Sequence, residues 1–264
     1  MELNICVCIK QVPDSNKVGV DPVTGVIKRG GADSKMNPYD LFALETAFRI
    51  REEKGGSITV ITMGPPKAEE IIREAFSMGA DSGVLLTDRR FAGADVLATS
   101  YAISQGITSA GDFDIIICGK QTTDGDTAQV GAEISEYLKL PCIAGVSEVS
   151  KFSDSEMVVK TDAGDSVMTA KISFPCLICV DKDIYQPRLP SYVRKKETAS
   201  RKIKVMTLDE LSDRDEKKYG LSGSPTQVRK IFPPENNIEH EILRGTPDEL
   251  ADGAVKKLSE LKLI

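Results

Sequence analysis

One segment of this sequence combines the residue types that bind phosphate. It reads GKQTTDGDTAQVG from Gly119 to Gly131 and directly follows an apolar run. A buried strand ending here would lead into a helix through a loop in which Gly119 and Gly125 are expected to adopt positive φ. Asp126 or Thr127 is expected to cap that helix. Backbone amides at such a junction point outward, where they can bind an anion.

Acidic and amide side chains near this segment indicate what else it does. Asp124 and Asp126 would repel a diphosphate, so they are expected to hold the loop or to bind ribose hydroxyls. Asn37 precedes Pro38 at the start of a predicted helix, where capping is its simplest role. The chemistry indicated is phosphate binding, and no side chain is predicted to be catalytic.

The remaining chemistry-bearing residues argue against catalysis or metal binding by side chains. The single histidine, His240, lies in a polar stretch, which excludes most His-based catalysis and His-rich metal sites. Six cysteines lie mostly within apolar runs, as expected of reduced thiols in a core. Cys176 and Cys179 would face opposite sides of a strand and cannot easily share a metal. A bound cofactor is therefore expected to carry any redox chemistry.

The elements that must position the segment alternate between strand and helix. Apolar runs predict strands at 3–9, 57–63, 83–87, 115–118 and 141–149. Apolar stripes predict helices from Asn37 to Gly55, over 71–78, over 94–105 and after the phosphate-binding segment. This alternation implies an α/β fold with a doubly wound, mostly parallel sheet. Ligands bind such sheets beyond the carboxyl ends of the strands, where the segment lies.

The pattern changes after residue 151. Residues 157–161 and 166–171 predict a small antiparallel addition to the sheet, residues 175–180 a further strand, and residues 18–28 a separate small hairpin. The stretch 209–240 is too polar to bury a core alone. We expect a nucleotide-binding α/β domain over 1–207 and, over 208–264, an extended C-terminal arm that includes a short helix.

Composition and charge exclude some partners. The 264 residues, 41% of them hydrophobic, suffice for one large core and an appendage. A net charge of -6 argues against nucleic acid as the main partner. The N-terminus lacks a basic region followed by an apolar one, and no apolar stretch approaches a membrane span. We expect a cytoplasmic protein.

Five landmarks, in order, make the sequence resemble the β subunits of electron-transfer flavoproteins. They are CIKQVP at 8–13, MNP at 36–38, AFSMGAD at 75–81, GKQ at 119–121 and PRLP at 187–190. The resemblance spans nearly the whole chain. It implies an adenine-nucleotide α-hydrolase-like fold and a heterodimer in which the C-terminal arm packs on an α subunit.

The resemblance also implies which residues surround an adenine nucleotide. One group would lie around the nucleotide: Cys8, Asn37, Asp40, Thr62 and Met63. A second group would wrap its phosphates: Gly119, Gln121, Thr122, Asp124, Gly125, Asp126, Thr127, Ala128, Gln129, Val130 and Gly131. Small residues at 125, 128 and 131 would leave room for a bulky ligand. The segment is more similar to FAD-binding, electron-bifurcating members than to members that hold structural AMP.

The FAD-binding branch implies a specific electron path. NADH would reduce the FAD, one electron would pass to ferredoxin, and the other would pass through an α-subunit FAD to a partner flavin dehydrogenase. That partner would be of the acyl-CoA dehydrogenase type or a FAD-dependent lactate dehydrogenase. Two alternatives stay open: a carrier that holds AMP and does not react with NADH, and an ATP-sensing, stress-protein-like domain that binds no flavin. The long C-terminal arm argues against the sensor.

A stretch after Pro187 matches the family's partner-recognition loop. It would offer an apolar anchor with a basic rim, formed by Leu189, Tyr192, Val193, Arg194, Lys195 and Lys196. The alternative is an amphipathic turn packed on its own domain.

Overall fold

The computed structural model describes residues 2–14, 34–153, 155–229 and 242–264. The hairpin predicted within 18–28 therefore lies outside the described residues, as does His240. The chain forms two compact units, the first ending at Arg229 and the second beginning at Lys230.

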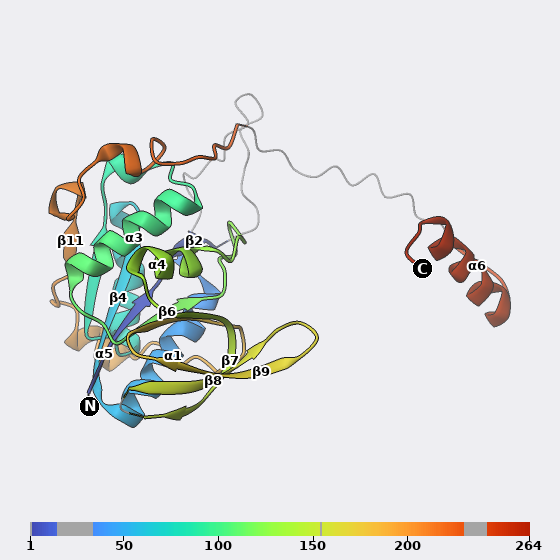
Figure 1. The fold of residues 1–264 in the computed structure, drawn as a ribbon, viewed down its shortest axis with the longest axis horizontal. Helices are drawn as coiled ribbons and strands as arrows, with labels where there is room; N and C mark the ends of the chain where they lie inside the picture. Colours follow the sequence, from blue (N-terminus) through green and yellow to red (C-terminus); the bar gives the residue numbers. More distant parts are fainter. Residues whose placement is uncertain (1, 15–33, 154, 230–241) are drawn as a thin grey trace. The chain divides into compact units, whose positions relative to one another are not determined.

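A nine-stranded sheet forms the first unit, in the order β11-β5-β4-β1-β6-β10-β7-β8-β9 (Figure 1). The pairs from β11 to β7 are parallel, and β8 and β9 continue the sheet antiparallel. This confirms the predicted mostly parallel sheet with an antiparallel addition. The strands are β1 (Leu3–Cys8), β4 (Gly56–Met63), β5 (Ser82–Leu86), β6 (Ile115–Gly119), β7 (Cys142–Phe152), β8 (Glu156–Asp162), β9 (Val167–Ser173), β10 (Cys176–Val180) and β11 (Lys204–Met206). Two short strands, β2 (Gln11–Pro13) and β3 (Ser34–Met36), pair antiparallel in a second sheet.

Helices cover both faces of the large sheet. Helices α1 and α2 pack on one face, α3 and α4 on the other, and α5 packs against α2. Their bounds are α1 (Pro38–Lys54), α2 (Glu69–Met78), α3 (Val96–Ala110), α4 (Val130–Leu138) and α5 (Tyr192–Glu197), with short 3-10 turns at Pro66–Ala68, Arg89–Phe91, Leu208–Glu210 and Glu216–Lys218.

Glycines end the first two helices where the sequence predicted. Gly55, with φ of 77°, follows α1, and Gly79, with φ of 133°, follows α2. Both conformations lie in the region that favours glycine. Within α1, the side chains of Leu44 and Phe48 are fully buried. Burial of each stabilises the fold by roughly 1.5–3 kcal/mol.

The central strands are buried on both faces, which explains their unbroken apolar runs. In β1, Ile5 and Val7 belong to the core beneath α1 and α2, whereas Cys6 belongs to the core beneath α3 and α4. In β10, Cys176 faces the first core and Cys179 the second, as predicted from their spacing.

A row of thiols crosses the sheet on the α3 and α4 face. Cys118 of β6 pairs in register with Cys8 of β1 on one side and with Cys179 of β10 on the other. Cys142 of β7 contacts the same core. All six cysteines are free.

Residues beyond 207 continue the first unit instead of leaving it. The Tyr219 ring is 1% exposed and packs against Phe91 and Tyr101, with ring centroids 5.6 and 5.4 Å apart. The Arg90 guanidinium pairs with Asp209 at 3.0 Å. The compact unit thus extends to Arg229, 22 residues past the predicted division at 207.

The second unit contains helix α6 (Pro247–Glu260). A capping box between Thr246 and Glu249 begins it, and Pro247 occupies its first turn. None of its residues is buried within this chain. Across the described ranges, no helix is both long and apolar enough to cross a lipid bilayer.

Candidate functional site

The predicted nucleotide-binding residues come from three neighbouring strand ends and one helix start. Strand β6 ends at Gly119, and helix α4 begins at Val130. Strands β1 and β4 end at Cys8 and Met63. Because β4, β1 and β6 are adjacent and parallel, their carboxyl ends lie at one edge of the sheet.

Asn37 joins the start of α1 to the loop after β6. Its Nδ2 donates to the Gln121 carbonyl at 2.9 Å, and its Oδ1 accepts from the Thr123 amide at 3.2 Å. Asn37 occupies the N-cap position, but its side chain caps no α1 amide, so the predicted capping role is wrong. The side chain is fully buried and holds a loop more than 80 residues away.

Asp40 lies beneath this junction with both carboxylate oxygens engaged. Oδ1 accepts from Asn37 Nδ2 at 2.9 Å and Oδ2 from the Lys10 amide at 2.7 Å. The residue is only 4% exposed. Burial raises the pKa of Asp40 to about 7, although both hydrogen bonds oppose that rise. The Asp40 carboxylate therefore connects α1 to the segment after β1 through Lys10, and to the loop through Asn37.

Lys10 is a residue of this site that sequence reasoning missed. Its ammonium binds both oxygens of Asp124, at 2.7 and 2.8 Å. Burial alone would raise the pKa of Asp124, but the Lys10 ammonium holds it below the ordinary value. Gln121 Nε2 donates to Asp126. Both acids bond within the protein, which is compatible with loop-holding, one of the two roles expected of them. Lys10 lies two residues beyond the end of β1, and that position was the signal for it.

The loop turns through different residues than predicted. Positive φ occurs at Asp126 and Ala128, 54° in each, and not at Gly119 or Gly125. Gly119 is instead required by crowding, since a Cβ there would lie 2.6 Å from Asp40 Oδ1. At Gly125 a Cβ would meet nothing closer than 3.5 Å.

Helix α4 begins later than predicted and lacks a side-chain cap. Gln129 occupies the N-cap position, so neither Asp126 nor Thr127 caps the helix. Asp126 Oδ1 instead accepts a hydrogen bond from Gln121 Nε2. The first amides of an uncapped helix have no intrahelical acceptor and suit an anion.

Gly131 serves packing and not ligand space. A Cβ at this position would lie 2.3 Å from Cys179 Sγ and 3.4 Å from Cys118 Cβ. The first turn of α4 therefore rests directly on the thiol row. The predicted role of Gly131 in leaving room for a bulky ligand is wrong, because the space it leaves is filled by the sheet.

Thr62 and Met63 do not line one common surface. Met63, like Cys8, contacts the core beneath α3 and α4. Because successive strand residues point to opposite faces, the neighbouring Thr62 points to the other face of the sheet. Thr62 is 1% exposed, and its Oγ1 has no hydrogen-bond partner among the described residues. A buried hydroxyl without a partner is unusual and fits a polar ligand group that would complete it.

The loop as a whole is suited to a phosphate-containing ligand. Residues 123–129 are exposed, although the Thr123 amide donates to Asn37 and the Asp126 amide donates to the Thr122 carbonyl. The two carboxylates that would repel phosphate are bound to Lys10 and Gln121. What remains for a ligand is the backbone, the α4 N-terminus and the Thr and Gln side chains. No group of three or more His, Cys, Asp or Glu side chains in the described ranges is arranged to hold a metal ion.

The predicted docking residues lie at helix α5 and in the turn before it. Leu189, Tyr192 and Val193 are 87%, 69% and 63% exposed. Ser191 caps α5 by accepting from the Arg194 amide at 3.3 Å. The Lys196 ammonium lies 4.7 Å from the centre of the Tyr192 ring. Three large apolar side chains are thus held out to solvent on an ordered turn.

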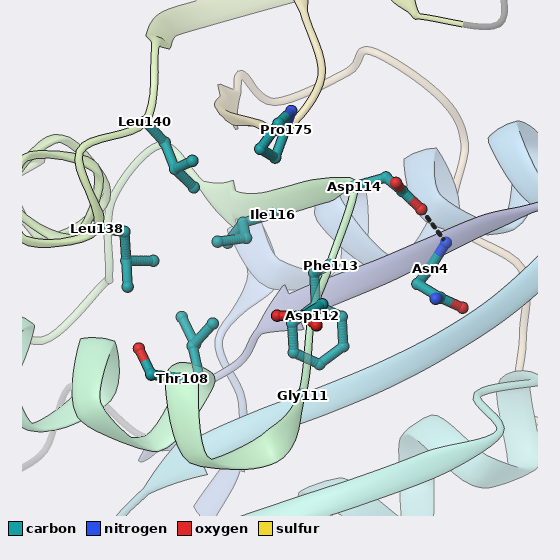
Figure 2. Close-up of a pocket in the computed structure, with 11 residues that line it drawn as sticks. Asn4, Thr108, Gly111, Asp112, Phe113, Asp114, Ile116, Leu138, Leu140 and Pro175 are labelled. Atoms are coloured by element: carbon teal, nitrogen blue, oxygen red, sulfur yellow. Dashed lines mark hydrogen bonds between the residues drawn. The ribbon is translucent and has the colours of Figure 1, made fainter. Parts of the chain in front are cut away.

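A cavity of about 440 Å³ lies at the opposite edge of the sheet (Figure 2). Its lining includes Asn4 near the start of β1, Asp114 before β6 and Pro175 before β10. The Asn4 amide donates to Asp114 Oδ2 at 2.8 Å. None of the predicted site residues lines this cavity.

Comparison with known proteins identifies the family to which this chain belongs. A family model described as an electron transfer flavoprotein domain matches residues 24–211. The electron transfer flavoprotein subunit beta of Thermoanaerobacterium thermosaccharolyticum is 42% identical over 99% of this chain and 100% of its own length. Subunit CarD of the caffeyl-CoA reductase-Etf complex of Acetobacterium woodii is 39% identical over 99% of this chain and 100% of its own length. Protein FixA of Sinorhizobium fredii is 44% identical over 88% of this chain and 84% of its own length.

Proposed function

This chain belongs to the electron transfer flavoprotein family as a β subunit, and we propose that it holds FAD between its β6–α4 loop and the carboxyl ends of β1 and β4. In this proposal it takes a hydride from NADH and divides the electron pair. One electron goes to ferredoxin, and the other goes through the FAD of an α subunit to a partner flavin dehydrogenase. The family match removes the ATP-sensing alternative.

The observation that carries the nucleotide site is the combination of an uncapped α4 and a strained residue before it. Ala128 has φ of 54°, a conformation that costs a non-glycine residue about 1 kcal/mol or more. Such strain persists where surrounding contacts impose it, often at ligand clamps. The first amides of α4, which have no intrahelical acceptor, would then bind the phosphates.

The chain's residues would act by binding and orienting. Bound FAD would supply hydride acceptance and one-electron transfer. The amides of residues 127–131 would hold the diphosphate, and Thr122 and Gln129 could hydrogen-bond the ligand. Thr62 Oγ1 would gain its missing partner. Lys10, Asn37 and Asp40 would keep the loop in place.

FAD is favoured over AMP by the sequence of the loop and by the kind of relatives found. The name of CarD places that protein in a complex with a caffeyl-CoA reductase. We extend this to the present chain as a partnership with a flavin dehydrogenase of the acyl-CoA dehydrogenase type, or with a FAD-dependent lactate dehydrogenase. The alternative, a carrier with structural AMP, would use the same phosphate site. Gly131 does not distinguish the two ligands, because it packs against the sheet.

The C-terminal unit and the exposed docking residues would bind other proteins. Residues 230–264, which form a unit of their own with no buried residue in α6, would pack on the α subunit. Leu189, Tyr192 and Val193 would dock the client dehydrogenase, with Lys195 at the basic rim. The six free cysteines suit the reducing cytoplasm.

Counting ligands tests the proposal. The α/β complex is purified, its ligands are released with acid, and FAD and AMP are quantified. Two FAD per complex, with flavin reduction on addition of NADH, is the expected result. One FAD and one AMP per complex, with no reaction with NADH, would establish the non-bifurcating carrier instead.

A further inference from the structure

The exposed docking residues lie between two internal attachments, and we propose that the ion pair between buried Glu45 and partly exposed Arg188 is the positioning element that holds this segment in its docking geometry. This inference rests on the proposed docking function. It assigns a positioning role to two residues that are not among the predicted docking residues. The segment meant is residues 187–197, called the docking segment below.

The first attachment is a fork of hydrogen bonds to helix α1. Arg188 Nε and its backbone amide both donate to Glu45 Oε2, at 2.8 and 3.1 Å. A guanidinium nitrogen donates to Glu45 Oε1 at 3.1 Å. The Arg188 guanidinium also pairs with Glu52 Oε1 at 2.8 Å and lies 4.5 Å from the centre of the Phe48 ring. Side chain and main chain of Arg188 are therefore fixed at once.

Glu45 is committed to this role by its burial. Its side chain is 2% exposed, so a carboxylate there needs charged partners. Burial would raise its pKa, but the guanidinium groups of Arg188 and Arg49 hold the pKa of Glu45 below the ordinary value. Arg49 contributes one bond, at 2.9 Å, from a side chain that is 54% exposed. Arg188 is thus the principal partner of a buried charge.

The second attachment fixes the other side of the segment to the end of helix α2. The Ser191 amide donates to the Ser77 carbonyl at 2.9 Å. The Arg194 guanidinium donates to the Met78 carbonyl at 2.8 Å. A Cβ at Gly79 would lie 2.6 Å from that guanidinium, so the close approach needs glycine. Leu189 projects between the two attachments.

An apolar side chain held out to solvent in this way is preorganised. A free turn would have to lose the motion of its backbone and side chains when a partner binds, which weakens binding. With Arg188 fixed, that ordering has already occurred on folding. Helix α1 also carries Asn37 and Asp40 at its start, so one rigid helix positions both the nucleotide loop and the docking segment.

The test compares Arg188→Gln with two reference variants in the α/β complex. Arg49→Gln removes the exposed partner of Glu45 and is the matched control. Leu189→Ala removes the docking side chain itself. Amide exchange is measured over residues 189–197, and flavin content and reduction by NADH are measured on the same preparations. Electron transfer is measured against increasing concentrations of a purified acyl-CoA dehydrogenase-type flavoprotein and, in parallel, a FAD-dependent lactate dehydrogenase.

Arg188→Gln is expected to raise the KM for the accepting dehydrogenase about tenfold, with kcat and flavin content retained and exchange accelerated. Arg188→Lys should show a KM between those of the parent and Arg188→Gln, because lysine restores the positive charge but not the forked pair of hydrogen bonds. Unchanged amide exchange and an unchanged KM in Arg188→Gln, together with a raised KM in Leu189→Ala, would overturn this inference but leave the docking function standing. An unchanged KM in Leu189→Ala with both acceptors would overturn the docking function and the inference with it.

Discussion

Replacing Asn37 by Asp tests the tie between α1 and the nucleotide loop with almost no change in shape. The Asn37 Nδ2 donates two hydrogen bonds, to the Gln121 carbonyl and to Asp40 Oδ1, both at 2.9 Å. In Asn37→Asp a carboxylate oxygen faces these two acceptors. The bond that Oδ1 accepts from the Thr123 amide can remain.

The expected loss follows from those two bonds. A neutral hydrogen bond contributes about 0.5–1.5 kcal/mol and one to a charged group about 1.5–3 kcal/mol. Asn37→Asp should therefore lower the free energy of unfolding by about 3 kcal/mol at pH 8. The loss should shrink as the pH falls, because two neighbouring carboxyls share a proton and the protonated one can donate again.

Denaturant unfolding of the α/β complex between pH 5.5 and 8 measures this loss, and acid release measures nucleotide per complex. Asn4→Asp is the matched control, since Asn4 Oδ1 only accepts a bond from Ser57 at 3.1 Å on an exposed surface. That control should change stability by less than about 0.5 kcal/mol. Nucleotide content should fall in Asn37→Asp and not in the control.

An Asn37→Asp complex with normal nucleotide content and a free energy of unfolding equal to that of the control would refute the reasoning. A loss that is the same at pH 5.5 and 8 would refute the part that involves Asp40. Either result would mean that the loop is held by other contacts.

Three further predictions follow from the same contacts. Burial raises the pKa of Asp40 from 3.8 to about 7, so between these pH values the folded state binds a proton that the unfolded chain has released. The free energy of unfolding should therefore fall by about 1.4 kcal/mol per pH unit as the pH rises from about 4 to 7. Asp40→Asn should remove that slope. Gly131→Ala should destabilise the complex by about 1–3 kcal/mol, and adding Cys179→Ala should recover part of it, while Gly125→Ala should be neutral in denaturant unfolding. Leu189→Ala should raise the KM for a client dehydrogenase about tenfold and leave flavin content unchanged.

Each of these has a clear contrary result. A pH dependence of stability that is equal in the parent and in Asp40→Asn would remove Asp40 as its source. Equal stability of the Gly131→Ala and Gly125→Ala complexes would show that α4 can move off the thiol row at no cost. A Leu189→Ala complex that loses flavin would mean that this side chain supports the fold.

The local elements of the fold were predictable because their signals are local. The helix that Asn37 and Pro38 begin ends at Gly55, as expected, and each apolar run is a strand. The order of strands was not predictable, since β10 lies between β6 and β7 through contacts that no local pattern encodes. Residues 208–229 illustrate the same limit, because their polar average hides one buried aromatic ring, Tyr219.

The position of the nucleotide loop was predictable, but its conformation was not. Strand-to-helix junctions with glycines are recognisable in sequence. Here, however, the positive φ values fall on Asp126 and Ala128. Asn37 and Lys10 hold the loop from distant parts of the chain, and no local pattern predicts those contacts. The two glycines at the ends of the segment, Gly119 and Gly131, are explained by crowding against α1 and the sheet.

The strand order also has a consequence for how the protein is made. Strand β10 is the last of the central strands to leave the ribosome, yet it joins β6 to β7 and so closes the middle of the sheet. Until residue 180 is available, β1, β4, β5 and β6 can pair on one side and β7, β8 and β9 on the other, with no strand between them. The sheet can therefore become continuous only after β10 has inserted between β6 and β7. The nucleotide loop, which leaves β6 beside that gap, would take its final shape only after the insertion.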